Sequence, residues 1–149
     1  MARVSRILFA SDFSKASGRA LAVALSLAKA TGAAVCILHV IVPITPLVPE
    51  QYLNAALLDE IDAQARKTSQ RHLTKLVAKA GKAGIRATSL LIEGDPADEI
   101  TRVARSKRAD LLVLGTHGRT GLAKFFVGSV AGRVIATASC PVVTARSAS

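Results

Sequence analysis

The sequence predicts a single doubly wound α/β domain: a five-stranded parallel sheet with helices on both faces. Short apolar runs alternate along the chain with longer segments of helical periodicity, which is typical of this fold class. The apolar runs are too continuous to have a side that faces water, as is usual in parallel sheets covered by helices. The 149 residues suit one domain, 1–149, and residues 144–149 are predicted to form a frayed tail.

The first helix and the strands on either side of it have clear boundary signals. Ile7–Ala10 is a short apolar run that predicts a buried strand opening into a polar loop. Ser14 is predicted to cap a helix that continues to about Ala30 and ends at Gly32. Val35–Val42, which is rich in valine and isoleucine, predicts the second buried strand.

The middle of the chain predicts a loop, a long helix and a third strand. Pro43–Pro49 holds three prolines and cannot be helix or central strand. Apolar residues then keep a helical spacing from about Glu50 to Lys82, and glycines at 81 and 84 close that helix. Ala87–Ile92 follows as a strand.

The last third predicts two further strand and helix pairs. Asp95 has the features of an N-cap, with proline at the first helical position, and its helix is expected to reach about Lys107. Asp110–Gly115 predicts the fourth strand. After a glycine-rich loop come a helix over Ser129–Thr137 and a fifth strand over Pro141–Thr144.

Composition argues against disorder and leaves the anionic partner open. Half of the residues are hydrophobic and the mean hydropathy is +0.38. A net charge of +10 attracts nucleic acid, acidic lipid or phosphorylated ligands alike. The longest apolar stretch, Ala33–Val42, falls short of the roughly 20 residues of a membrane helix. We expect a cytoplasmic protein with no membrane segment, in which Cys36 and Cys140 are buried free thiols or, alternatively, a disulfide or redox pair.

The glycine-rich loop, Gly115–Val130, is the strongest local signal for a ligand. Its glycines allow close backbone approach, and it leads from a buried strand to a helix N-terminus that favours an anion. Ser129 adds a hydroxyl there, and Arg119 and Lys124 add positive charge, so the parts of a phosphate cradle are present. It is neither a P-loop nor a dinucleotide fingerprint. The alternative is a flexible loop whose glycines serve tight turns and helix packing.

The same loop resembles a known family. Gly115-x-x-Gly118, nine residues and then Gly128-Ser129 are similar to the Gly-2x-Gly-9x-Gly-Ser/Thr nucleotide motif of the universal stress protein (UspA-type) family, in its ATP-binding subgroup. Ala10 departs from the pattern, because many members have proline two residues before the aspartate. The other similar pieces, in chain order, are Ile7–Ser14, His39-Val40, Gly94-Asp95-Pro96 and Ser139–Val143.

The resemblance implies strand order 3-2-1-4-5 in an adenine nucleotide alpha hydrolase-like domain, a homodimer paired through the last strand, and bound ATP with Mg²⁺ on its phosphates. It implies that Asp12 contacts the nucleoside and that the Val40 backbone contacts adenine. It also implies that Gly115, His117 and Gly118 line the ribose and phosphates, and that Gly128, Ser129 and Val130 hold the triphosphate. The site residues it implies are Ala10, Ser11, Asp12, Val40, Leu114, Gly115, His117, Gly118, Arg119, Gly128, Ser129 and Val130.

Other polar residues have competing interpretations. Asp12 suits a ribose-hydroxyl acceptor, and the alternative is a cap on the first helix. His39 is predicted to be a core or strand-end histidine and His72 to be exposed, and the dispersed histidines make no metal set. Arg71 and Lys75 belong to a basic helix face that is interpreted as solvated surface. Specific nucleic-acid binding is not expected, because only 3% of residues are aromatic.

The functional hypothesis is therefore an ATP-binding stress-response module that acts as a homodimer with little or no catalysis. No group in the predicted site obviously activates water, so any hydrolysis is expected to be slow. Two alternatives stay open. One is a slow ATPase or phosphotransfer enzyme, and the other is a dimeric scaffold that does not depend on nucleotide.

Overall fold

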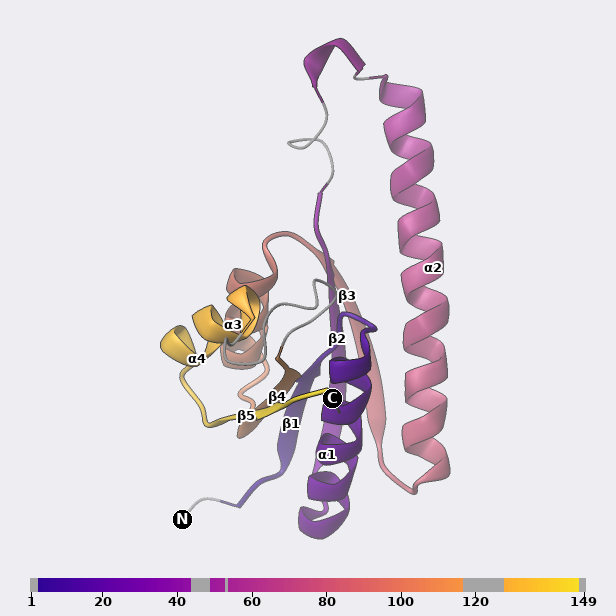
Figure 1. The fold of residues 1–149 in the computed structure, drawn as a ribbon. Coiled ribbons are helices and arrows are strands. Elements are labelled where there is room, and N and C mark those ends of the chain that lie inside the picture. The colour runs from indigo at the N-terminus through magenta and orange to yellow at the C-terminus, as the bar shows by residue number, and fades with distance from the viewer. Residues whose placement is uncertain (1–2, 44–48, 53, 117–127, 148–149) are drawn as a thin grey trace.

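A computed structural model of the chain describes residues 3–43, 49–52, 54–116 and 128–147, and it confirms the predicted fold class (Figure 1). Its five strands are parallel and lie in the order β3-β2-β1-β4-β5. The elements are β1 (Arg6–Ala10), α1 (Lys15–Thr31), β2 (Ala34–Ile41), the 3₁₀ turn η2 (Glu50–Tyr52), α2 (Ala55–Lys82), β3 (Ala87–Glu93), α3 (Pro96–Ser106), β4 (Leu111–Gly115), α4 (Ser129–Thr137) and β5 (Val142–Ala145).

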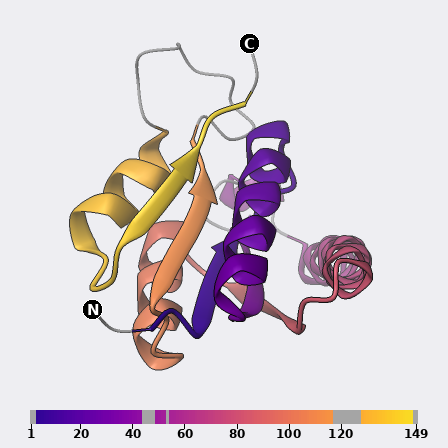
Figure 2. The ribbon, with the colours of Figure 1, turned by 90° about the horizontal axis from the view of Figure 1, so that it is seen from below.

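The sheet is covered on both faces, with α1 and α2 on one side and α3 and α4 on the other (Figure 2). Residues of β1 alternate between the two cores. Ile7 and Phe9 pack toward α1 and α2, whereas Leu8 and Ala10 pack toward α3 and α4. All four side chains are buried, which explains why this strand is a continuous apolar run.

Two of the predicted helix starts are confirmed in detail. The Ser14 hydroxyl accepts a hydrogen bond from the backbone N–H of Ser17, and the Asp95 carboxylate accepts one from that of Asp98. Gly32 ends α1 with a φ of 77°, a left-handed conformation that costs glycine little. These boundaries depend on contacts between residues close in sequence, so the sequence pattern predicted them.

The start of the long helix and the end of the last strand differ from the prediction. Residues 50–52 form a 3₁₀ turn, and α2 begins at Ala55 because Asn54 accepts a hydrogen bond from the N–H of Leu57. β5 continues to Ala145, whose side chain is buried and whose carbonyl accepts from the N–H of Thr116. Residues 144 and 145 therefore belong to the sheet and not to the tail.

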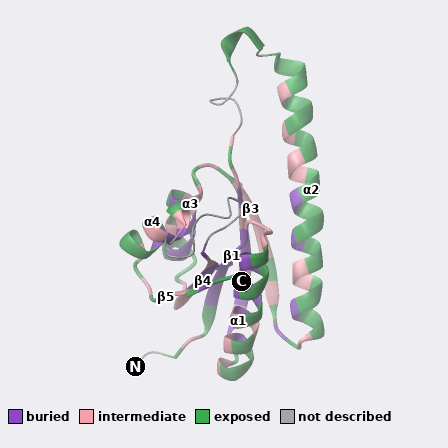
Figure 3. Cartoon of the chain, in the orientation of Figure 1, coloured by how far each residue is buried: buried purple, intermediate pink, exposed green. Residues whose placement is uncertain are grey.

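The two halves of α2 have different surroundings. In the C-terminal half, Leu73 and Ala80 are fully buried in the core beside α1. The N-terminal half rises past the sheet with η2, and most of it is exposed (Figure 3). Leu57 is 50% exposed and Ile61 is 41% exposed. The apolar spacing therefore predicted a helix correctly, but only its second half is core.

Both cysteines are free thiols, and each is half-buried instead of fully buried. Burial raises the pKa of the Cys36 thiol, and it is also the main cause of the raised pKa of Cys140. Both thiols are therefore protonated at neutral pH. Within the described ranges, no helix has the length and apolar character that crossing a membrane requires.

Candidate functional site

A pocket of about 740 Å³ opens at the carboxyl ends of the central strands. Its walls come from the loop after β1, the end of β2, the middle of α2, and the starts of α3 and α4. This is the edge at which doubly wound sheets bind ligands, where β1 lies between β2 and β4 and the strand order reverses. The volume is in the range of small-molecule sites, roughly 300–1,000 Å³.

The structure brings most of the predicted site residues together around this pocket. The predicted residues among its lining are Ala10, Ser11, Asp12, Val40, Leu114, Gly115, Gly128, Ser129 and Val130. His117, Gly118 and Arg119 lie outside the described residues, as does Lys124. The nucleotide contacts of all twelve residues stay predictions. Asp12 is the only acidic side chain among the described residues of the lining.

Hydrogen bonds hold the loop after β1 in a defined shape. The Ser11 hydroxyl accepts from the N–H of Phe13 at 3.1 Å and from the Ser17 hydroxyl at 2.7 Å. The Asp12 carboxylate accepts from the N–H of Ser14 at 2.9 Å. Ser14, and not Asp12, caps α1, so the competing interpretation of Asp12 as the helix cap is wrong. Asp12 remains in the pocket lining.

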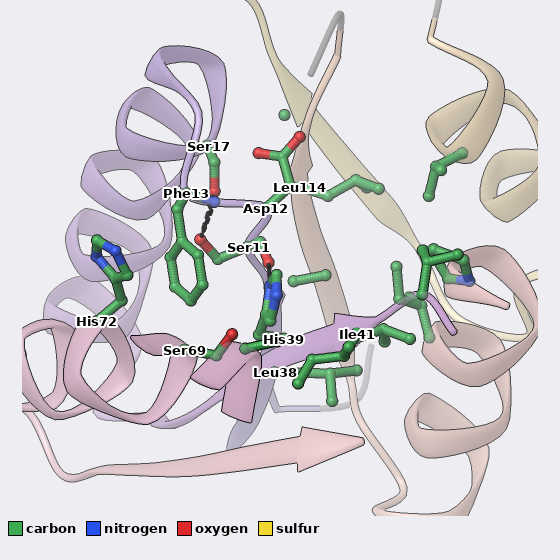
Figure 4. Close-up of a pocket in the computed structure, with 18 of the residues that line it drawn as sticks. Ser11, Asp12, Phe13, Ser17, Leu38, His39, Ile41, Ser69, His72 and Leu114 are labelled. Atoms are coloured by element: carbon green, nitrogen blue, oxygen red, sulfur yellow. Dashed lines mark hydrogen bonds between the residues drawn. The ribbon is translucent and has the colours of Figure 1, made fainter. Parts of the chain in front are cut away.

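Phe13 has a backbone conformation that is rare for a bulky residue. Its φ is 63°, in the left-handed region, which costs about 1–3 kcal/mol for a residue other than glycine. Its ring stacks on His39 with a centroid distance of 4.3 Å and on His72 with one of 4.6 Å (Figure 4). The strained residue therefore lies between two rings from β2 and α2.

The two histidines have roles that sequence reasoning missed. His39 is a strand-end histidine as predicted, and its Nδ1 lies 2.7 Å from the Ser11 carbonyl. Because a carbonyl only accepts, Nδ1 carries the proton and donates. His72 is exposed as predicted, but it also lines the pocket and stacks on Phe13. Among the described residues, no three His, Cys, Asp or Glu side chains are grouped as a metal site would need.

The pocket face of α2 was also missed. It contributes Ile61, Gln64, Ala65, Thr68, Ser69 and His72. The available signal was a break in the apolar spacing of the helix. Ile61 and Ala65 continue the face that carries Leu73. Between Ala65 and Leu73, however, the positions 68 and 69 hold a threonine and a serine, and Ser69 is buried. A polar stretch on the inner face of a helix indicates a cavity there.

Gly115 has a structural function that the glycine motif did not reveal. A Cβ built on it would lie 2.7 Å from the backbone carbon of Ala16 and 2.9 Å from the backbone nitrogen of Ser17. The end of β4 thus approaches the first turn of α1 so closely that no side chain fits. The interpretation of this glycine as a packing residue is correct at Gly115, which also lines the pocket.

The start of α4 differs from the other helix starts. α1, α2 and α3 have side-chain caps from Ser14, Asn54 and Asp95. α4 has Gly128 at its N-cap with no side-chain cap from the described residues, and its first turn holds no acidic residue. Its first N–H groups lie at the pocket, because Gly128 and Ser129 line it. Such a helix start can accept an anionic group.

The charges around α3 are paired. Arg133 of α4 donates to the carboxylate of Asp95 at 3.2 Å and to that of Asp98 at 2.9 Å. The Asp98 backbone N–H and then the Arg133 guanidinium hold the pKa of the Asp95 carboxyl below its usual value. Arg133 therefore neutralises acids at the start of α3 and is not among the residues that line the pocket.

Fold and pocket together define a doubly wound α/β protein with a pocket at the carboxyl edge of its sheet. The Universal stress protein family matches residues 3–146, and the chain belongs to that family. Universal stress protein YxiE of Bacillus subtilis is 34% identical over 146 residues, or 95% of this chain and 99% of that protein. A crystal structure of a family protein from Burkholderia pseudomallei is 29% identical with a TM-score of 0.76, covering 97% of each chain.

Two solved structures of the same fold contain a nucleotide. One is a universal stress protein in complex with cAMP, 22% identical, with a TM-score of 0.69 and coverage of 99% of this chain and 100% of that one. The other is the universal stress protein from Archaeoglobus fulgidus in complex with dAMP, 24% identical, with a TM-score of 0.64 and coverage of 97% and 99%. At these identities the likeness establishes a shared fold.

Proposed function

We propose that this protein binds an adenine nucleotide, ATP with Mg²⁺ on its phosphates, in the pocket at the carboxyl edge of the sheet. The observation that carries the proposal is the start of α4, which lies at the pocket with no side-chain cap from the described residues and no acidic residue in its first turn. Phosphate groups suit such a helix start. The family proteins bound to cAMP and dAMP support the choice of an adenine nucleotide.

The remaining walls suit the other parts of a nucleotide. Asp12 offers carboxylate oxygens to ribose hydroxyls, which are donors. Val40 lies at the end of β2 beside Leu38 and Ile41, and this apolar wall suits the adenine ring. No Lys or Arg side chain belongs to the described lining, so Mg²⁺ would reduce the charge of the phosphates, together with Arg119 of the predicted motif.

We infer a binding and signalling function in a stress response, with little or no catalysis. A water-activating base must reach the reacting phosphate, and Asp12 is the single carboxylate in the described lining. His39 is committed to a hydrogen bond with Ser11 and to the stack with Phe13. The free thiols of Cys36 and Cys140 suit a reducing compartment such as the cytoplasm.

We also infer a homodimer paired through β5. This strand lies at an edge of the sheet, with β4 on one side only. Edge strands present unpaired backbone groups that can pair with a second copy. Thr144 is exposed on this strand, and Val142 and Val143 are half-buried.

Calorimetric titration with ATP and Mg²⁺ tests the site, with Asp12→Ala as the variant. We expect a single site per chain in the wild type and an affinity about 10-fold lower in Asp12→Ala, because a hydrogen bond to a charged group is worth about 1.5–3 kcal/mol. Asp59→Ala removes the same charge from an exposed position of α2 and serves as the control. No binding in the wild type, or equal affinity in all three proteins, would contradict the proposal. Native mass spectrometry of the same samples gives the ratio of chains to nucleotides.

A further inference from the structure

Three rings from three separate elements form a continuous stack beside the pocket. Phe13 comes from the loop after β1, His39 from β2 and His72 from α2. The centroids of Phe13 and His39 are 4.3 Å apart with planes 28° apart, and those of Phe13 and His72 are 4.6 Å apart with planes 26° apart. Figure 4 shows the Phe13 ring between the two imidazoles. We call these three side chains the Phe13 stack.

The stack acts on the residue that carries the pocket's carboxylate. Asp12 directly precedes Phe13, and their side chains leave the loop in opposite directions, the ring toward the histidines and the carboxylate away from them (Figure 4). The φ of Phe13, 63°, decides the direction of the chain on both sides of it. Such a conformation persists only where the surrounding structure over-determines it.

The Phe13 ring also lines a second, smaller cavity. This cavity has a volume of about 140 Å³ and lies between α1 and α2. Ser11, Phe13, Ser17 and His72 line both the cavity and the larger pocket, so the Phe13 ring is part of the partition between them. The other residues that line the cavity are Phe9, Ser14, Gly18, Leu21 and Leu76. Phe13 also packs against the apolar core beside α1 and α2, and the two imidazoles are the rings that flank its faces.

We propose that the Phe13 stack positions the carboxylate of Asp12 in the pocket, so that His72 of α2 sets the affinity for the nucleotide without belonging to the glycine motif. The proposal rests on the proposed function, and it makes Phe13 and His72 positioning residues for that site. His39 anchors the stack, because its Nδ1 donates to the carbonyl of Ser11 in the same loop. Aromatic pairs of this kind contribute specific geometry beyond the area that they bury.

The competing interpretation is that Phe13 is only a hydrophobic plug between the helices. In that case His72 is an exposed side chain that covers the plug, and truncating it changes stability but not the position of Asp12. The two interpretations differ in what a ring substitution at 72 does. A plug needs buried apolar area, whereas positioning needs a flat ring parallel to Phe13.

The test compares Phe13→Leu, His72→Ala and His72→Phe by calorimetric titration with ATP and Mg²⁺. We expect Phe13→Leu and His72→Ala to bind ATP about 3- to 10-fold more weakly, as expected for loss of one aromatic pair. His72→Phe keeps a ring against Phe13 and is expected to bind within about twofold of the wild type. Gln70→Ala, an exposed substitution on the same helix, serves as the control. Equal affinity in all these proteins would overturn the proposal.

A second measurement needs no nucleotide. The backbone N–H of Ser14 donates to the Asp12 carboxylate, so its hydrogen exchange reports the position of that carboxylate. We expect faster exchange at Ser14 in Phe13→Leu and His72→Ala, and wild-type exchange in His72→Phe and Gln70→Ala. Unchanged exchange in the first two variants would overturn the positioning role. If the wild type binds no ATP but the variants still differ in Ser14 exchange as expected, the proposed function is overturned and the positioning of Asp12 stays supported.

Discussion

The connections from β3 to α3 and from β4 to α4 leave the same edge of the sheet but differ at the helix that follows. The first backbone N–H groups of α3 have a side-chain cap, and those of α4 have none from the described residues. The β3–α3 connection is short: Gly94 follows the strand and Asp95 caps the helix with its own carboxylate. Asp98 and Glu99 add negative charge to the first turn of α3. The β4–α4 connection begins after Gly115 and ends at Gly128, which offers no side chain to the N–H groups of α4.

The difference shows how neighbouring helices can have separate tasks. Acidic residues at the start of α3 itself interact favourably with its helix dipole and first N–H groups. Arg133 of α4 pairs with two of them, Asp95 and Asp98. α4 begins without such acids, so an added anion is not repelled there. The start of α3 stabilises the fold, and we propose that the start of α4 binds phosphate. Substitutions at three positions, Gly115, Gly128 and Asp95, change this contrast.

The largest effect is expected from Gly115→Ala, which alters the beginning of the β4–α4 connection. A Cβ there would lie 2.7 Å from the backbone of Ala16, and backbone cannot move aside as a flexible side chain can. We expect the free energy of unfolding to fall by about 2–3 kcal/mol, the upper part of the range for overpacking. Urea denaturation measures it. Gly132→Ala in α4 is the control, since nothing lies within 4 Å of its Cβ, and it should be neutral or stabilising. Similar stabilities for both variants would contradict the packing role of Gly115.

Gly128→Asp makes the start of α4 resemble that of α3. The φ of −56° and ψ of 152° at Gly128 suit any residue, and aspartate is a good N-cap, so stability should stay the same or rise by a few tenths of a kcal/mol. We expect the affinity for ATP to fall about 10-fold, because a carboxylate replaces the anion at the helix start. Calorimetric titration measures it. Gly128→Ser supplies a cap without a charge and should lose less affinity. ATP binding at wild-type strength by Gly128→Asp would contradict the proposed phosphate site.

The smallest effect is expected from changes at Asp95, which make the start of α3 more like that of α4. Asp95→Ala removes the cap and the pairing with Arg133, and we expect the melting temperature to fall by about 2–4 °C. Asp95→Asn keeps a cap but loses the charge, so a smaller decrease is expected. Neither should change ATP affinity, because Asp95 is not among the residues that line the pocket.

Acid titration of the same variants gives a direction with a definite sign. The folded-state pKa of Asp95 is lowered, chiefly by the Asp98 backbone N–H and then by Arg133. Its contribution to stability is therefore complete above the unfolded pKa of about 3.9 and is lost as the pH falls through the lower folded value. Below about pH 4, the wild type should lose stability more steeply than Asp95→Asn. Parallel pH profiles for the two proteins would contradict this role of Asp95.

Local signals made much of the fold predictable. The caps at Ser14 and Asp95 were predictable because each side chain accepts a hydrogen bond from the backbone N–H three residues further on. The α2 start was wrong by one turn because Asn54 caps the helix after a separate 3₁₀ turn, and apolar spacing does not distinguish the two. The glycine motif indicated the edge of the sheet at which the pocket opens. It did not reveal the contribution of α2 to the pocket, because the polar break in the apolar spacing of this helix does not tell which strand end the helix covers.

By itself, the sequence determined the five strands, the helices between them and the parallel class of the sheet, since continuous apolar runs need helices on both faces. It also determined that Asp12 and the two ends of the glycine loop would lie near one edge. Only the tertiary structure decided that Gly115 is pressed against α1 and that Phe13 lies between His39 and His72. The physical reason is distance along the chain. Caps and periodicity act between near neighbours, whereas a close approach or a ring stack exists only once separate elements have packed together.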